Sequence, residues 1–269
     1  MTNRICFHHD EECRSLSVIP SQHSIIRAVN LVYYEPGVDM PMHDHGVGQF
    51  STMLSGLSQE CNLSGDIDLP LGIVAYKPIN YRHSNKIGPE GAIFLSIDIR
   101  ADHPDFLYEY GRLDWATSDV KAANALWRCL LVSVLSEQAA SIDFEEQVLS
   151  LLNQFLTKPR QLKTLPHWLK LAQQAVVETS WSISDVASEV GVHRVHLCRA
   201  FQSQFGLSVS QFRQRHKLQT SLFSMFSQKQ DIASASLQSG FADQSHFTRT
   251  LKQHFGITPM KLLRVFSPN

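Results

Sequence analysis

The segment "DIASASLQSGFADQSHFTRTLKQHFG", residues 231–256, predicts two short helices joined by a tight turn. Its apolar residues recur at steps of three and four, which is the spacing of one buried helix face. Between the helices, Gly240 supplies the residue type that most readily adopts positive φ, and Phe241 can fill the angle behind the turn. This pattern is typical of a helix-turn-helix unit, whose second helix keeps an outer face for polar side chains.

The same pattern occurs once more upstream, in "WSISDVASEVGVHRVHLCRAFQSQFG", residues 181–206. Gly191 takes the place of Gly240 at an offset of 49 residues, and Phe205 takes that of Phe255 at an offset of 50. A single copy would be a weak signal, but two copies in register are a strong one. The repeat therefore predicts two helix-turn-helix units.

A cap and a connecting helix complete this predicted domain. Ser182 or Ser184 can cap the first helix, because a serine hydroxyl accepts a hydrogen bond from an unpaired N–H there. The segment "SVSQFRQRHKLQTSLFSM", residues 208–225, predicts one continuous helix between the two units. The polar side of that helix is expected to carry Arg213, Arg215 and Lys217.

These residues closely resemble the AraC/XylS family of transcription regulators. The most specific part is "SGFADQSHFTRTLKQHFGITP", residues 239–259, which ends on the family's G-x-T-P pattern at Gly256, Thr258 and Pro259. The resemblance covers roughly residues 167–266. It implies an all-α domain of two helix-turn-helix units that binds promoter DNA, with RNA polymerase as a further partner.

The resemblance also implies which side chains meet DNA, because each second helix would enter a major groove. Arginine can bind guanine through two hydrogen bonds, glutamine can pair with adenine, and valine can contact a thymine methyl group. The outward residues are Arg194, Val195, Cys198, Arg199, Gln244, Ser245, His246 and Arg249. Arg213, Lys217 and Lys252 are expected to bind phosphates, which fixes the position of the protein without reading sequence.

The charge of the chain divides at the proline-flanked segment "TKPRQLKTLP", residues 157–166. Residues 1–165 carry 13 Lys and Arg against 20 Asp and Glu, a net charge of −7. Residues 166–269 carry 11 against 5, a net charge of +6. A basic C-terminal third on an acidic remainder predicts that the C-terminal part meets a polyanion.

Short β-rich runs separated by Gly, Pro, Asn and Asp occupy residues 25–100, and they predict a small sandwich or barrel. Among them, "PMHDHGVGQF", residues 41–50, holds two histidines that leave the same face of an extended strand. Two sets of spaced residues resemble the double motif of the cupin jelly roll: Gly37, His43, His45, Gln49 and Gly56, and then Gly72, Pro78, Asn80 and His83.

Metal-binding cupins hold a divalent metal with two histidines and a glutamate of the first motif and one histidine of the second. The resemblance therefore assigns His43, His45, Gln49 and His83 to the effector site, with the three histidines as candidate metal ligands. Gln49 departs from the pattern, because an amide is a poor ligand for a transition metal. Three histidines alone can still hold Zn²⁺ or Fe²⁺ with an open position. The alternative is a barrel mouth that is empty or takes a small-molecule effector.

The cysteines predict no disulfide framework, and the acidic segment near the N-terminus is only a minor candidate for metal binding. The five cysteines are odd in number, scattered and never in a C-x-x-C pair, which predicts reduced thiols. The segment "CFHHDEEC", residues 6–13, can also bind metal, but its place near a terminus favours a solvated, mobile segment.

Residues 119–157 return to helical spacing, with two apolar stripes separated by "SEQAASID". The stripes can form an αα-hairpin that packs on the barrel, or they can form a dimer seam. The family resemblance favours dimerisation, and therefore a homodimer. We expect a cupin-like sensing domain at residues 1–115, a helical dimerisation and linker region at 116–160, and the double helix-turn-helix domain at 161–269.

Together these patterns predict an α+β multidomain protein: a cupin-like β-barrel, a helical hairpin and a C-terminal all-α DNA-binding domain. The functional hypothesis is a cytoplasmic transcription regulator, without a membrane span, that responds to a small molecule or metal in the barrel. The alternative is a metal-dependent cupin enzyme fused to a DNA-binding domain. Gln49 in place of the carboxylate argues against catalysis, so no catalytic residue is assigned.

Overall fold

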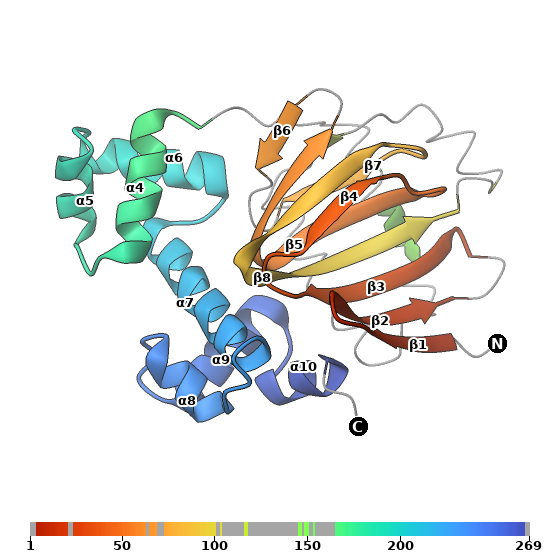
Figure 1. Ribbon diagram of the computed structural model, residues 1–269. Coiled ribbons are helices and arrows are strands. Elements are labelled where there is room, and N and C mark those ends of the chain that lie inside the picture. Colours follow the sequence, from red (N-terminus) through yellow and green to blue (C-terminus); the bar gives the residue numbers. More distant parts are fainter. Residues whose placement is uncertain are drawn as a thin grey trace.

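The computed structural model describes residues 4–20, 24–62, 65–68, 73–100, 103, 116–117, 145–146, 148–150, 153 and 165–266. Figure 1 shows an N-terminal part built from strands and a C-terminal part built from helices. The predicted α+β class is confirmed, with an antiparallel sheet in the N-terminal part and a helical C-terminal part.

The sheet contains nine antiparallel strands among the described residues, in the order β1-β2-β3-β8-β5-β7-β9. Strand β4 pairs with β8 and β6 pairs with β5, beside this path. The long strands β5 and β8 pair with each other over most of their length. The bounds are β1 Arg4–His9, β2 Cys13–Ile19, β3 Ile26–Tyr34, β4 Asp39–His43, β5 Gly48–Asn62, β6 Gly65–Asp68, β7 Val74–Lys77, β8 His83–Ile99 and β9 Ala116–Thr117.

The two faces of the sheet differ because side chains alternate along each strand. One face carries buried apolar residues such as Leu31, Phe50 and Ile97, which belong to one hydrophobic cluster. The opposite face carries polar residues at the alternate positions, among them Asn30 and Asp98.

Two expectations about the N-terminal part are corrected by the strands. Residues 6–13 are exposed in part, as expected of a solvated segment, but they are held in place: β1 and β2 pair along their length, and Asp10 accepts hydrogen bonds from the backbone N–H groups of Glu12 and Cys13 at the turn. The last β-rich run, "AIFLSIDIR" at residues 92–100, predicts a strand that begins nine residues too late, because β8 starts at His83. The helical hairpin expected at 119–157 and the motif residue Gly72 lie outside the described residues, apart from the few positions given above.

The helical part follows the predicted repeat. Helices α5 and α8 have seven residues each, and α6 and α9 have twelve each. Gly191 and Gly240 both adopt positive φ at the turns, at 69° and 79°. The bounds are α4 His167–Glu178, α5 Ile183–Glu189, α6 Arg194–Phe205, α7 Val209–Phe226, α8 Ile232–Gln238, α9 Gln244–Phe255 and α10 Pro259–Phe266.

Local hydrogen bonds explain where these helices begin. Of the two serines that could cap α5, Ser182 does so: it accepts from the backbone N–H of Asp185, whose carboxylate in turn accepts from the N–H of Ser182. Asp231 caps α8 and Asp243 caps α9 through the same kind of side-chain acceptor. Each reciprocal or single cap satisfies an N–H that has no partner within the helix.

The second helix-turn-helix unit packs directly on the sheet. Leu222 and Phe226 of α7 share one hydrophobic cluster with Leu31 and Leu95 of the sheet. In Figure 1, α7 runs from the first unit (α5 and α6) to the second unit (α8 and α9), and α10 lies beside β1 and β2. The first unit forms its own cluster with α4 and the start of α7. Among the described residues, one core is thus shared between the sheet and the second unit, a separate core belongs to the first unit, and a small third cluster of Met53, Ile87 and Ala92 lies in the sheet.

The expectation that Arg215 lies on the polar side of the connecting helix is wrong. Its side chain is buried, with 7% of the residue exposed, and burial lowers the pKa of the guanidinium to about 10. A guanidinium with a pKa near 10 is still charged at neutral pH. The polar spacing along α7 did not reveal this burial, because it arises from packing against other elements and not from the helix itself.

Candidate functional site

The outer face of α6 is the first candidate DNA-contacting surface. Arg194, Val195 and Arg199 are exposed, and Val195 is 47% exposed although it is apolar. The helix begins after His193, whose Nδ1 accepts a hydrogen bond from the N–H of Val195. An open hollow runs along this face and is lined by His193, Arg194, Val195, Cys198, Arg199 and Gln202. All four sequence-predicted readers of the first unit thus lie on one surface.

The corresponding face of α9 is the second candidate surface. Gln244, Ser245 and Arg249 are exposed, and His246 is half-buried with its ring 5.2 Å from that of Phe241. The opposite side of α9 buries Phe247 and Leu251 in the core. The two helices therefore present equivalent polar faces, with Arg249 in the place that Arg199 has in the first unit.

The three residues predicted to bind phosphate have different surroundings. Lys252 is exposed in the last turn of α9. Arg213 donates hydrogen bonds to the carbonyl oxygens of Val176 and Trp181, at 3.0 and 2.8 Å. Lys217 donates from Nζ to the carbonyl oxygen of Gly240 at 2.9 Å. Arg213 and Lys217 thus hold each unit against α7, whereas Lys252 has no such structural task among the contacts that the described residues make.

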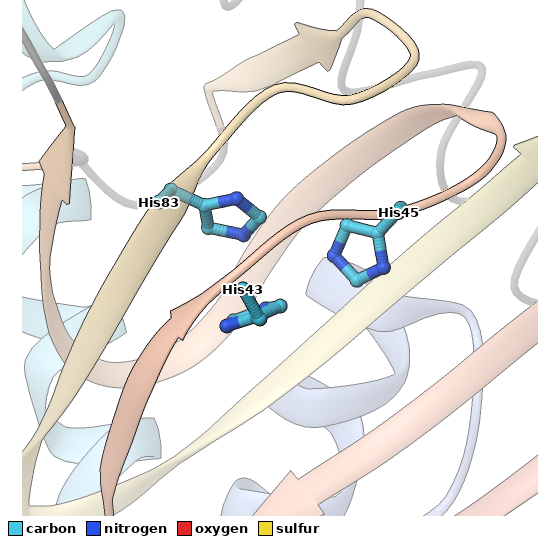
Figure 2. A group of neighbouring side chains, drawn as sticks. All are labelled: His43, His45 and His83. Carbon is cyan, nitrogen blue, oxygen red and sulfur yellow. The ribbon is translucent and has the colours of Figure 1, made fainter.

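The three histidines of the cupin-like motifs converge on one point. Figure 2 shows the rings of His43, His45 and His83 facing one another. Their centroids lie 4.4 to 5.2 Å apart, and one ring nitrogen of each lies within 4.8 Å of the others. His43 ends β4 and His83 begins β8, and these two residues are register partners in the sheet.

The loop that carries His45 is fastened by a backbone contact. The N–H of Asn80 donates to the carbonyl oxygen of His45 at 3.0 Å, and Asn80 adopts a φ of 60°. Asparagine tolerates this left-handed conformation better than most residues do, which explains why it can stand where the cupin pattern has a glycine. This contact joins the loop of the first motif to the second motif, whose His83 ring lies 5.2 Å from the ring of His45.

The protonation of the histidines suits metal coordination. Nδ1 of His43 contacts the carbonyl oxygen of Pro41 at 2.8 Å, and Nδ1 of His83 contacts that of Tyr81 at 3.1 Å. Because a carbonyl oxygen only accepts, each Nδ1 carries a proton, and Nε2 is the nitrogen that can bind a metal when the ring is neutral. Backbone contacts of this kind orient the histidine ligands of metal sites.

Burial, and then the nearby Lys77 ammonium, lower the pKa of both His45 and His83, the latter to about 3. Those rings are neutral at physiological pH. The neutral imidazole is the form that binds a metal, so the donor set fits Zn²⁺ or Fe²⁺.

Gln49, the fourth residue assigned to the effector site, does not stand alone. Its Nε2 donates to Oδ1 of Asp98 at 3.0 Å, across the β5–β8 pair. Next to it, Lys77 and Glu60 form a buried ion pair of 2.7 Å. Sequence reasoning missed Asp98, Lys77 and Glu60, because only the strand register shows that they share the polar face with Gln49.

A second group of potential ligands lies at the β1–β2 turn. His8, Asp10 and Cys13 each offer one ligand atom, and these atoms lie within 4.8 Å of one another. His8 and Asp10 already contact each other at 2.7 Å, and both are exposed. This cluster lies in the segment 6–13, which the sequence offers as a second possible place for a metal.

No helix within the described residues is long and apolar enough to cross a bilayer.

Comparison with known proteins identifies the helical domain. Residues 186–264 match the family model described as a helix-turn-helix domain. An uncharacterized HTH-type transcriptional regulator of Haemophilus influenzae is 25% identical over 154 residues, which are 57% of this chain and 48% of that protein. The HTH-type transcriptional regulator MtrA of Neisseria gonorrhoeae is 27% identical over 177 residues, which are 62% of this chain and 54% of that protein. The chain thus spans about half the length of these curated relatives.

Among solved structures, ToxT from Vibrio cholerae aligns with 89% of this chain and 98% of its own, with a TM-score of 0.39 and 14% identity. The family match confirms that residues 186–264 hold the predicted helix-turn-helix domain, and the relatives are named transcriptional regulators.

Proposed function

We propose that this chain is a sequence-specific DNA-binding transcription regulator whose DNA binding is controlled by a ligand in the cupin-like sheet. The observation that carries the proposal is the pair of equivalent helices, α6 and α9, with Arg199 and Arg249 exposed at corresponding places. The names of the relatives, which are transcriptional regulators, support it.

In this proposal each of the two helices reads base edges in a major groove. Arg194, Val195, Cys198 and Arg199 are the readers of the first unit, and Gln244, Ser245, His246 and Arg249 are those of the second. Lys252 binds a phosphate and gives affinity without sequence preference. Arg213 and Lys217 contribute positive charge near the backbone while holding the units in place.

The ligand site is the cluster of His43, His45 and His83, with Gln49 beside it. Two ligand classes fit: a divalent metal on the three neutral imidazoles, or a small molecule in the same place. A bound metal would supply a fixed positive charge and three bonds that join β4, the 44–47 loop and β8. The names of the relatives, which are transcriptional regulators, disfavour the cupin-enzyme alternative.

Coupling to the DNA-binding domain passes through contacts between the sheet and the second unit. Gln49 of the proposed ligand site is the second residue of β5. Further along the same strand, the carbonyl oxygen of Gly56 accepts a hydrogen bond from Gln219 of α7 at 3.4 Å. Strand β2 contributes Arg14, which donates to the last carbonyl oxygens of α7 and α10. A ligand that binds more tightly to one arrangement of β5 than to another changes the populations of the two arrangements. The position of α7 against the sheet then changes with them.

The domain limits proposed from the sequence are 1–115, 116–160 and 161–269. We further propose that the chain forms a homodimer through residues 116–160, and that RNA polymerase is contacted at the promoter. A change in the distance between two protomers' DNA-binding domains would then decide which half-sites can be occupied together.

A map of the chromosomal sites occupied by the full-length chain tests the proposal. We expect occupancy at a small set of promoters that share a bipartite motif, and loss of this occupancy in a variant with both Arg199→Ala and Arg249→Ala. Occupancy spread evenly over the chromosome, or unchanged in the double variant, would refute sequence-specific binding by these helices.

A further inference from the structure

We propose that Asp98 supplies the carboxylate of the three-histidine metal site, in the place that a glutamate at position 49 would fill in a metal-binding cupin. The inference rests on the metal form of the proposed function. It assigns a role to a residue of β8 that lies outside both cupin-like motifs.

Strand register places Asp98 in the site. Gln49 of β5 pairs with Lys77 of β7 on one side and with Asp98 of β8 on the other. Register partners in an antiparallel pair project from the same face of the sheet, so these three side chains form one row. Lys77 ends β7 and Gln49 lies at the start of β5, so the row lies next to the 78–82 and 44–47 loops, which the hydrogen bond from Asn80 to His45 joins.

The charges in this row do not cancel. Lys77 is neutralised by Glu60, whose Oε2 lies 2.7 Å from the ammonium, with both residues buried. Asp98 accepts hydrogen bonds from two neutral amides, Gln49 at 3.0 Å and Asn30 at 3.1 Å. Within the part of the chain that the structure describes, Asp98 makes no ion pair.

Hydrogen bonds fix the position of this unpaired carboxylate. Asn30 also donates to Ser96 at 3.3 Å and accepts from Ser17 at 2.7 Å, so the amide that holds Asp98 is itself held from β2 and β8. Such a chain of contacts gives Asp98 a defined orientation. A carboxylate that is fixed but carries no counter-charge is suited to receive a cation.

A divalent metal on three neutral imidazoles keeps its full double charge, and that charge is costly in a partly buried site. Asp98 would offset half of it from beside the three ligands, through hydrogen bonds to a metal-bound water. This explains the amide at position 49. A glutamate there would face Asp98 as a second carboxylate, whereas Gln49 donates to it.

Metal titration of the full-length chain tests the assignment. The chelator-treated protein is titrated with Zn²⁺, and with Fe²⁺ under anaerobic conditions, by calorimetry. The variants are Asp98→Asn, His83→Ala and, as a control, Asp66→Asn, which removes an exposed carboxylate of β6. We expect Asp98→Asn to weaken binding by about 10 to 100-fold, as loss of a partner of metal ligands typically does. Asp66→Asn should bind as the unmodified chain does, and His83→Ala should not bind at all.

A compensating variant separates charge from folding. Gln49→Glu combined with Asp98→Asn returns the carboxylate to the cupin position, and we expect it to recover affinity to within a few-fold of the unmodified chain. If the unmodified chain binds metal and Asp98→Asn binds equally well, the role of Asp98 is refuted while the histidine site stands. If Asp98→Asn is weak and the exchange does not recover, Asp98 acts through folding and the inference fails. If the unmodified chain binds neither metal, the metal form of the proposed function fails as well.

Discussion

Arg14 of the sheet donates a hydrogen bond from Nη2 to the carbonyl oxygen of Phe226, the last residue of α7, at 3.3 Å. The same guanidinium donates to the carbonyl oxygen of Phe266 at the end of α10, at 3.3 Å, and pairs with Glu35 at 2.7 Å. Because the C-terminal end of a helix carries partial negative charge, one cation on β2 stabilises the ends of two helices.

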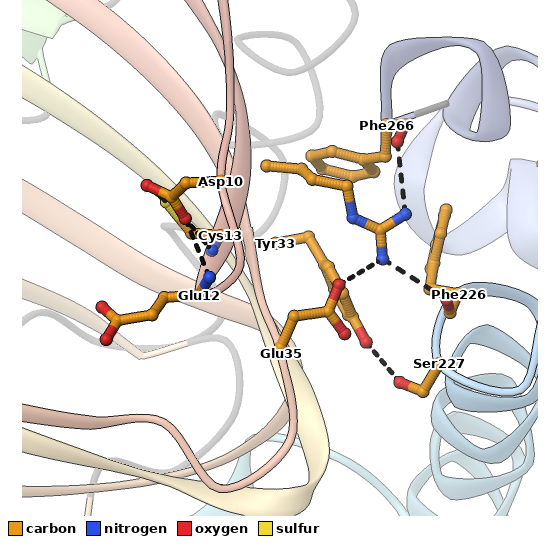
Figure 3. A network of polar contacts seen from close by, with 9 residues as sticks. Asp10, Glu12, Cys13, Tyr33, Glu35, Phe226, Ser227 and Phe266 are labelled. Carbon is orange, nitrogen blue, oxygen red and sulfur yellow. Dashed lines mark hydrogen bonds and ion pairs between the residues drawn. The ribbon is translucent and has the colours of Figure 1, made fainter. Parts of the chain in front are cut away.

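Aromatic rings surround this contact. The Arg14 guanidinium lies 4.6 Å from the centroid of the Tyr33 ring, and Tyr33 packs against Phe226 and Phe266 with centroids 5.4 and 6.0 Å away. The hydroxyl groups of Tyr33 and Ser227 are hydrogen-bonded, as Figure 3 shows. The sheet thus holds the second helix-turn-helix unit at its helix ends.

Removing this cation should loosen the second unit. We expect Arg14→Ala to lower the free energy of unfolding by about 1 to 3 kcal/mol, because it leaves helix carbonyls and Glu35 without their donor. The measurement is urea unfolding followed by circular dichroism. Arg27→Ala, which changes an exposed arginine of the neighbouring strand β3, is the matched control and should be nearly neutral. Equal effects of the two substitutions would contradict the docking role of Arg14.

Base reading and phosphate binding should separate in the second unit. Arg249→Ala is expected to lower affinity for a promoter site by about 1 to 3 kcal/mol and to relax the preference at one base pair. Lys252→Ala should weaken binding to all sequences alike and reduce the salt dependence. Both are checked by titrating labelled DNA at several salt concentrations. Unchanged base preference in Arg249→Ala would remove α9 as a reading helix.

A glycine in β5 should resist substitution. Gly56 has a φ of 94°, and an added Cβ would lie 2.0 Å from the carbonyl oxygen of Gly91. Gly56→Ala therefore combines backbone strain with a clash against backbone, and we expect a loss of more than about 2 kcal/mol in unfolding free energy. Gly46→Ala is the control, because its Cβ would meet nothing within 4 Å and its φ is not positive. A stability of Gly56→Ala close to that of Gly46→Ala would contradict the described β5–β8 pairing.

The buried histidines predict the acid response of the metal-free protein. Burial and Lys77 lower the pKa of His83 from 6.5 to about 3, and that of His45 is lowered too. Below pH 6.5 the unfolded chain therefore binds more protons than the folded chain, so stability should fall as the pH drops from about 6.5 towards 3. The slope is at most about 1.4 kcal/mol per pH unit for each histidine.

His83→Gln should flatten this profile, and His167→Gln, at an exposed position of α4, should leave it unchanged. Unfolding midpoints measured in urea at several pH values check the difference. Identical profiles for the unmodified chain and His83→Gln would show that the His83 ring is not buried in its neutral form.

The helical domain could be predicted almost completely from the sequence, because its signals are local. Gly191 and Gly240 mark the turns, Ser182 caps a helix three residues before its acidic partner Asp185, and the repeat shows each feature twice. The exception is Arg215, which has a polar side chain at a helix position that tertiary packing buries. No local pattern distinguishes such an arginine from an exposed one.

The ligand site could be predicted only in part. The spacing of the cupin-like motifs was sufficient to predict that His43, His45 and His83 lie together, since those residues belong to the pattern itself. It was not sufficient for Asp98, which joins Gln49 through a strand pairing that depends on the register of β5 with β8. The assignments to the helical hairpin and the dimer remain predictions, because those residues lie outside the described part of the chain.

Helix α7 fixes the rotation of the two helix-turn-helix units relative to each other. It is continuous over 18 residues from Val209 to Phe226, and both units are attached to it. Inserting one residue in its middle would turn one unit about 100° around the helix axis relative to the other and shift it by about 1.5 Å. The outer faces of α6 and α9 would then no longer keep their orientation relative to each other. Length changes between the units are therefore tolerable at the loops but not within α7, whatever the sequence of the bound promoter.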